Sequence, residues 1–415
     1  MIATHRRIVI AFALAAAGQA RAQAMRRFTP VEDLRIGALS AIGQRDMLVT
    51  IAPDGRAIVA PRYGGMPIIA FDSLGKRLSW KVSVGPRDDA EIGIPSRIGW
   101  IAGTRTMWVA DQGYHQVALV DSTGKVFKSI EDPSWIHPSW AERRKYPVFA
   151  TMQVFALYKD ESMLLLPGRE RALLDTPGYD RSGLHLLRAS WSGAIQRTVA
   201  MVPETQAAVV LRGKGCEHVA TIPFASRPMW SVSADGSRIV IATPGVSLAD
   251  SGTLRLTVIG ERGDTLFSRT LVQPAVRVPQ ASIDNLLSNQ RACGAFSVEA
   301  IRDSLSRRVS VFKSFLVAVL PGRDQTTWVT MRAAADTSIE RTAIGLDERG
   351  EIIGAVALPV NQTLVGADRG HIWMVETGRM RSPAAIVRYR LDATPAPPPR
   401  TGRGGTPPGL SRSRE

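Results

Sequence analysis

Aromatic and cationic side chains are grouped in two segments of this chain, and they are the residues best suited to binding chemistry. One group lies within residues 131–149 and the other within 167–183. Flat rings stack on sugars and peptides, and guanidinium groups pair with carboxylate or sulfate oxygens. The candidate ligand-binding residues are Trp135, His137, Trp140, Arg143 and Tyr146 in the first segment, and Arg169, Arg171, Tyr179 and Arg181 in the second. The alternative interpretation is that each loop folds down on its own aromatic anchors.

Signatures of known catalytic chemistry are missing from the sequence. It contains neither a Gly-x-Ser-x-Gly nucleophile turn nor a glycine-rich phosphate loop that opens a helix. The histidines beyond the N-terminal segment do not have the spacing of metal ligands: His115, His137, His185, His218 and His371. No reaction is indicated, and no catalysis is expected from these motifs.

The first 24 residues have the features of a secretory signal peptide. A cationic start at His5–Arg7 precedes an apolar run, Ile8–Ala17, and then small residues that end at Ala24. We expect cleavage after Ala24, and therefore an exported protein, periplasmic or extracellular, without a stable membrane anchor. The apolar run is shorter than a membrane span, and no later segment offers about twenty apolar residues. The alternative is an N-terminal anchor that is not cleaved.

An exported protein meets an oxidising environment, and this bears on the two cysteines, Cys216 and Cys293. Two cysteines are too few for a structural zinc site, so they form either a disulfide or a pair of buried thiols.

The formal net charge is +15 at pH 7. Because exported proteins rarely meet nucleic acid, an anionic polymer is the more sensible partner for this charge. The alternative is a basic surface with no specific partner.

A repeated turn predicts the architecture. Asp-x-x-Gly, or a variant of it, joins two apolar strands at residues 72–75, 121–124, 190–193, 260–263 and 347–350. The Asp side chain caps such a turn, and Gly supplies its positive φ. Together with a second class of tight turn, these signals mark units of four strands at residues 46–85, 96–130, 150–201, 228–272, 314–358 and 362–392. Such a repeat predicts an all-β fold, a six-bladed β-propeller of four-stranded antiparallel blades.

The last unit is one strand short, and residues 34–39 could supply that strand and close the ring. Between blades 4 and 5 we expect a short helical insertion, at about residues 279–313. Val298, Ile301, Leu305, Val309 and Phe312 form an apolar stripe at helical spacing, behind a capping Ser297. Residues 25–392 thus form one propeller domain, and the Pro/Gly/Arg-rich residues 393–415 form a disordered tail.

The order of the turns separates the two faces of a propeller. In a four-stranded blade the first and third turns lie on one face, and these are the short turns. The long segments lie on the opposite, loop-bearing face: residues 131–149, 167–183, 202–227 and 273–313. Variable loops on a rigid scaffold are where binding is usually built. Cys216 and Cys293 fall in links on either side of the fourth blade, which favours a disulfide.

The run Trp108–Lys125 resembles one NHL repeat, with "VAD" at the end of a strand and "VDSTGK" at the next turn. The resemblance implies a propeller of the kind found in uncharacterised exported bacterial proteins. Gln116 stands where NHL repeats usually carry Arg. The same scaffold hosts lyases and lactonases, which bind a divalent metal such as calcium in the central channel. Candidate ligands for such a metal are Asp111, Asn361 and Glu376.

Two functions remain after this comparison. The first is an exported propeller scaffold that binds a protein, peptide or polymer ligand on its loop-bearing face, with no cofactor and no catalysis. The second is a metal-dependent enzyme of the lactonase or lyase kind that uses the central channel. The residues do not identify the ligand or the oligomeric state.

Overall fold

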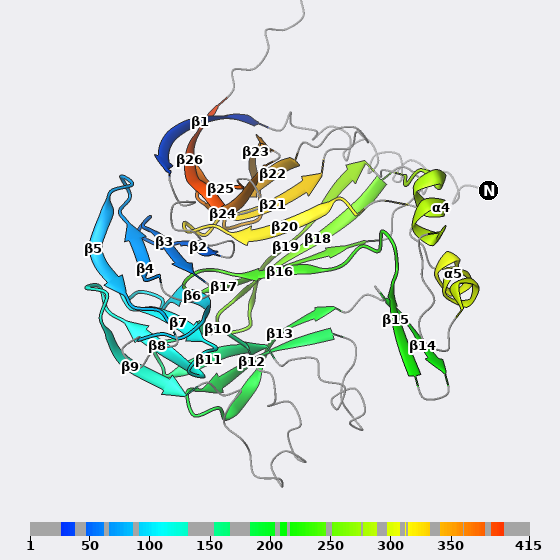
Figure 1. Cartoon of the computed structure of the whole chain (residues 1–415). Coiled ribbons are helices and arrows are strands. Elements are labelled where there is room, and N and C mark those ends of the chain that lie inside the picture. Colours follow the sequence, from blue (N-terminus) through cyan, green and yellow to red (C-terminus); the bar gives the residue numbers. More distant parts are fainter. Residues whose placement is uncertain are drawn as a thin grey trace, which may run out of the picture.

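The structure is a computed structural model of the whole chain (Figure 1). It describes residues 26–37, 47–61, 66–85, 91–131, 153–166, 183–203, 208–213, 216–245, 251–274, 277–288, 297–307, 312, 314–332, 341–359, 361–377 and 383–393. The predicted signal peptide and tail lie outside these residues. In this part of the chain no helix is long and apolar enough to cross a membrane.

The fold is all-β, with a propeller-like arrangement of antiparallel sheets. Four sheets have four strands each, in sequence order. Their strands are β2 Met47–Ile51, β3 Ala57–Pro61, β4 Ile68–Phe71 and β5 Arg77–Val82; β6 Pro95–Trp100, β7 Met107–Asp111, β8 Gln116–Val120 and β9 Val126–Glu131; β10 Gln153–Leu157, β11 Ser162–Leu166, β12 Gly183–Ser190 and β13 Ile195–Pro203; and β16 Met229–Val232, β17 Arg238–Pro244, β18 Ser251–Gly260 and β19 Thr265–Pro274.

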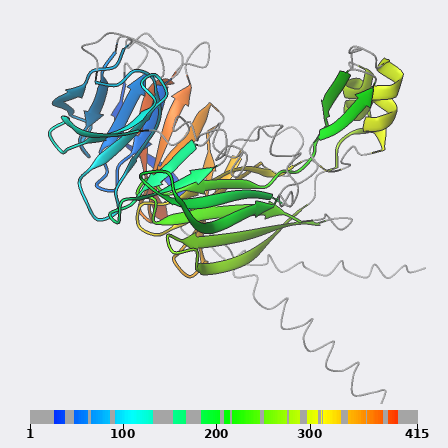
Figure 2. The same cartoon turned by 90° about the horizontal axis from the view of Figure 1, so that it is seen from below.

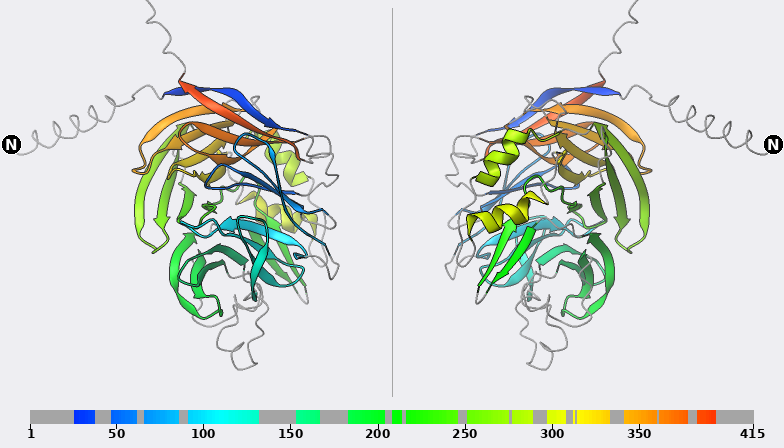
Figure 3. Two further views of the ribbon diagram at one scale, coloured as in Figure 1. Left: turned by 90° about the vertical axis from the view of Figure 1, so that its left-hand side faces the viewer. Right: turned by 90° about the vertical axis from the view of Figure 1, so that its right-hand side faces the viewer.

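A fifth sheet has eight strands, so the expectation of six separate four-stranded sheets differs from what is seen. Its order is β20-β21-β22-β23-β1-β26-β25-β24. The strands are β20 Leu316–Pro321, β21 Thr327–Arg332, β22 Arg341–Leu346, β23 Ile352–Leu358, β1 Arg27–Ile36, β26 Pro383–Ala393, β25 His371–Thr377 and β24 Gln362–Ala367. The N-terminal strand β1 joins the two halves, because it pairs antiparallel with β26 and parallel with β23 at Arg27 and Phe28. Figure 3 shows β1 (blue) beside β26 (red).

The first strands of the sheets lie toward the centre of the molecule. β2 lies beside β6 and β24, β6 beside β10, and β20 beside both β16 and β24. The third and fourth sheets meet where the Tyr158 hydroxyl donates to the Gly236 carbonyl at 3.2 Å. Burial of the Tyr158 phenol raises its pKa, so this hydroxyl stays protonated. Apolar side chains fill the space between neighbouring sheets; Ile58 and Val109, for example, belong to one cluster between the first two sheets.

The Asp-x-x-Gly turns have the geometry that their sequence predicts. In the second sheet, Asp121 Oδ1 accepts hydrogen bonds from the backbone N–H groups of Thr123 (2.8 Å) and Lys125 (3.0 Å). Gly124 has a φ of +86°. A Cβ on Gly124 would also lie 2.5 Å from the Trp80 ring of β5. These turns therefore pack against the outermost strand of the preceding sheet, and only Gly fits there.

A small unit beside the sheets differs from the expected loops. Residues 202–227 were expected to be an irregular link, but they contain a hairpin of β14 Ala208–Gly213 and β15 Cys216–Thr221. Two helices, α4 Gln280–Ser288 and α5 Val298–Ser306, pack with it at one side of the molecule (Figure 2).

Helix α5 lies where the apolar stripe predicts one, and the Ser297 hydroxyl caps it by accepting from the Ala300 N–H at 3.2 Å. The helix ends at Ser306, and Phe312 forms an isolated bridge with Arg277, whereas Val309 lies outside the described residues. The buried Ile301 and Leu305 of α5 pack on the hairpin. The apolar stripe predicted the helix but not the hairpin on which it packs. The hairpin strands are not joined by an Asp-x-x-Gly turn, so the repeat pattern did not mark them.

We predict that Gly124→Ala lowers the free energy of unfolding by about 1–3 kcal/mol, because it adds both a positive-φ penalty and a clash with Trp80. Urea unfolding measures this change. Gly37→Ala is the matched control, since a Cβ at Gly37 meets nothing within 4 Å. Equal stabilities of the two variants would contradict the packing role of the turn.

Candidate functional site

The ligand-binding residues predicted from the sequence all lie outside the described residues: Trp135, His137, Trp140, Arg143, Tyr146, Arg169, Arg171, Tyr179 and Arg181. Their role stays a prediction. The disulfide is also untested, because Cys293 lies outside the described residues, whereas Cys216 is the first residue of β15.

The three metal-ligand candidates do have described positions. Asp111 is fully buried, and its carboxylate accepts from the backbone N–H groups of Gly93 (2.9 Å), Ile94 (2.7 Å) and Gly113 (2.8 Å). Glu376 forms an ion pair with Arg35 at 2.7 Å, and Asn361 lies in an exposed turn. The described ranges contain no group of three or more His, Cys, Asp or Glu side chains that could hold a metal ion. Asp111 therefore organises a loop, which is a structural role that the sequence analysis did not assign.

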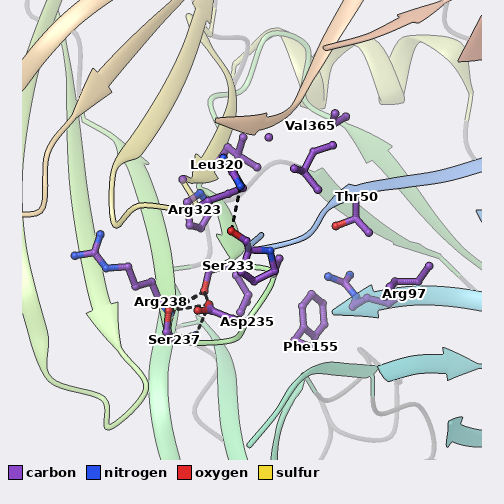
Figure 4. A pocket seen from close by; sticks show the side chains of 18 of the residues that line it. Thr50, Arg97, Phe155, Ser233, Asp235, Ser237, Arg238, Leu320, Arg323 and Val365 are labelled. Atoms are coloured by element: carbon purple, nitrogen blue, oxygen red, sulfur yellow. Dashed lines mark hydrogen bonds between the residues drawn. The ribbon is translucent and has the colours of Figure 1, made fainter. Parts of the chain in front are cut away.

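A cavity of about 400 Å³ lies among the first strands, and we call it the axial cavity (Figure 4). Strands β2, β6, β10, β16, β20 and β24, or the turns after them, all contribute to its wall. Its charged lining residues are Arg97, Asp235, Arg238 and Arg323. Asp368 pairs with Arg323, so three guanidinium groups stand against two carboxylates and the site keeps a net positive charge.

Arg97 lies within a stack of flat groups on one side of the axial cavity (Figure 4). Its guanidinium carbon is 3.7 Å from the centre of the Phe155 ring, which in turn contacts Trp230 at a centroid distance of 4.6 Å. Stacking uses the face of the guanidinium group, whereas its N–H donors lie in its plane. The contact with the Phe155 ring therefore fixes where this cation lies.

Arg323 is held by the turn after β2, the turn after β24 and strand β25. Its Nη2 donates to Asp368 Oδ2 at 2.5 Å, its Nη1 donates to the Pro53 carbonyl at 3.0 Å, and its guanidinium carbon lies 4.4 Å from the centre of the Trp373 ring. The Nε of Arg323 is buried and has no hydrogen-bond partner among the described residues. A buried N–H without an acceptor costs about 1–3 kcal/mol.

Trp108 also lines the axial cavity, but its polar atom is enclosed by the fold. The residue is 1% exposed, and its Nε1 is buried without a partner in the described part of the chain. Gly99 of β6 makes room for the indole ring, because a Cβ there would lie 2.5 Å from Trp108 Cζ2. Trp108 thus contributes its ring to the wall of the cavity.

The opposite part of the wall is formed by the turn between β16 and β17. Asp235 Oδ1 accepts from the hydroxyl groups of Ser233 and Ser237, each at 2.7 Å. Arg238 extends away from Arg97 and donates to the Gln325 carbonyl (Figure 4). Burial lowers the pKa of the Arg238 guanidinium, and nearby carboxylates oppose that shift in part.

The sequence did not indicate the axial cavity. The cavity lies where the first strands end in short turns, such as residues 53–56 after β2. Binding was expected on the opposite, loop-bearing face. The lining residues come from five different sheets, so no single local motif marks them. The available signal was an arginine inside or next to an apolar first strand, as at Arg97 and Arg323.

Comparisons with known proteins leave the family open. No family model matches the chain, so the NHL resemblance stays a prediction, and no curated protein matches either. Among solved structures, a member of the DUF4221 family from Bacteroides vulgatus is 11% identical, with a TM-score of 0.48 over 90% of this chain and 100% of that one. A putative exported protein from Bacteroides fragilis is 10% identical, with a TM-score of 0.43 over 89% and 96%. Virginiamycin B lyase from Staphylococcus aureus is 11% identical, with a TM-score of 0.38 over 88% and 100%.

We predict that Asp111→Ala lowers the free energy of unfolding by about 2–4 kcal/mol, because buried backbone N–H groups lose their acceptor. Asp303→Ala is the control, since this exposed aspartate pairs only with Arg307 on the surface of α5. Chemical denaturation of both variants measures the difference. A calcium-induced rise in melting temperature that Asp111→Ala abolishes would instead assign Asp111 to a metal site.

Proposed function

We propose that this protein is an exported binding scaffold without catalytic activity that holds an acidic group of its ligand in the axial cavity. The observation that carries this proposal is the excess of guanidinium groups in the lining of that cavity, where Arg97, Arg238 and Arg323 outnumber Asp235. Asp368 pairs with Arg323, whose side chain still keeps 20% of its surface exposed. An acidic group of a ligand would balance the remaining positive charge.

The types of the lining residues narrow the chemistry of the ligand. Arg side chains only donate hydrogen bonds, so their partner must be an acceptor. A carboxylate, sulfate or phosphate group accepts several such bonds and also balances the cationic lining. The positive charge of the Arg97 guanidinium group, fixed on Phe155, would attract the same group.

The scaffold in this proposal is a six-bladed propeller of the NHL-like kind. Counting strands β20–β23 as one blade and β24, β25, β26 and β1 as another gives six. Support for this count comes from the parallel contact between the two halves of the eight-stranded sheet, which is limited to Arg27 and Phe28 of β1. The edge strands β20 and β24 lie side by side near the centre, as first strands of neighbouring blades would.

Further parts of the proposal rest on the sequence alone. The signal-like residues 1–24 support export to the periplasm or beyond. The aromatic and cationic residues of 131–149 and 167–183 would form a separate surface, on the loop-bearing face, that binds a protein, peptide or anionic polymer. A disulfide between Cys216 and Cys293 would brace the links around the fourth sheet.

The competing function is a metal-dependent lactonase or lyase that uses the central channel. Metal analysis of the purified protein, combined with melting curves in the presence of a chelator, separates the two functions. A bound divalent metal, together with a large drop in melting temperature on chelation, would favour the enzyme. An unchanged melting temperature would favour the binding scaffold.

We predict that galacturonate, a sugar with one carboxylate, binds to the purified protein and that Arg97→Gln weakens this binding at least tenfold, by about 1.4 kcal/mol. Isothermal titration calorimetry measures both. Arg262→Gln removes the same charge from an exposed turn that lines neither the axial cavity nor its neighbour, and it should leave the affinity unchanged. Equal losses in both variants would reduce the effect to net charge and reject the site.

A further inference from the structure

A second cavity, of about 300 Å³, lies next to the axial cavity, and Pro53 lines both. It is bounded by the turn after β2, the turn after β6 and Ser122 in the turn between β8 and β9. We call it the side cavity. Because the two cavities share a wall residue, one extended ligand could occupy both.

The side cavity is also cationic. Arg56 and Arg105 line it together with a single carboxylate, Asp54. Arg56 Nε is bound to Asp54 at 2.8 Å, and the Arg56 side chain is only 18% exposed. Arg105 is exposed and forms no ion pair within the described residues. An anionic group would therefore find an uncompensated guanidinium there.

The turn at Pro53 lies between the two cavities, and Arg323 of the axial cavity holds it in place. The Pro53 carbonyl accepts a hydrogen bond from Arg323 Nη1 at 3.0 Å. The Ser122 hydroxyl and the Asp54 carboxylate add acceptors to the donors of the side cavity. A sugar unit that carries both an acidic group and hydroxyl groups matches this mixture.

We propose that the ligand is an acidic oligosaccharide that places one acidic group in the axial cavity and another in the side cavity. This inference rests on the proposed binding function of the axial cavity and extends it to a second subsite. Two linked groups bind more tightly than one, because the second binding event occurs at the high local concentration set by the first.

The test is a calorimetric series with galacturonate, digalacturonate and trigalacturonate at one ionic strength. We expect trigalacturonate to bind at least tenfold more tightly than galacturonate, beyond the few-fold statistical gain from extra units. Arg105→Gln should remove most of that gain and leave the affinity for galacturonate unchanged. Arg105 is exposed, so this variant keeps the Arg56–Asp54 pair and the fold. Arg262→Gln, the same charge change outside both cavities, should retain the whole gain.

Each contrary outcome has a separate meaning. Equal affinities for the monomer and the trimer, or an Arg105→Gln loss of equal size for both, would overturn the side-cavity subsite and leave the axial site standing. No binding of galacturonate to the wild-type protein would overturn the proposed function itself. A gain with triglutamate as large as that with trigalacturonate would assign the side cavity to acidic peptides and reject the oligosaccharide.

Discussion

The pairing of the N-terminal strand β1 with the C-terminal strand β26 is the constraint on which the rest of the structure depends. It runs from Phe28 opposite Ala393 to Ile36 opposite Ile386. Without it, β26 and β23 would both present unpaired backbone groups, as open sheet edges do. With it, the last sheet curves until its edge strands β20 and β24 lie beside each other and beside the first strands of their neighbours. The axial cavity exists because these first strands are brought to a common centre.

Arg323 links segments that this closure brings together. Its backbone N–H donates to the Ala367 carbonyl at 2.9 Å, and its guanidinium group reaches Asp368 and Pro53. Segments more than 250 residues apart in the chain thus meet at one side chain. Because two hydrogen bonds and the Trp373 ring already hold its guanidinium group, Arg323 would bind an acidic group with little loss of side-chain entropy.

The sequence predicted the local structure well where a turn has a chemical cause. Asp121 and Gly124 specify their turn through a carboxylate cap and a positive φ, and Ser297 caps helix α5 as its position indicates. The eight-stranded sheet was not predictable, because the parallel contact of Arg27 and Phe28 with β23 depends on how the ring closes. The axial cavity was missed for a similar reason. Arg97, Phe155 and Arg323 are far apart in sequence, and only the arrangement of the sheets brings them to one cavity.

The most direct test is a crystal structure of the protein with trigalacturonate. The central claim is that the cationic axial cavity holds an acidic group of the ligand. We predict a carboxylate of the ligand in that cavity, with an oxygen at about 3 Å from a guanidinium nitrogen of Arg97 or Arg323. A ligand bound only on the loop-bearing face, with the axial cavity empty of it, would contradict this claim.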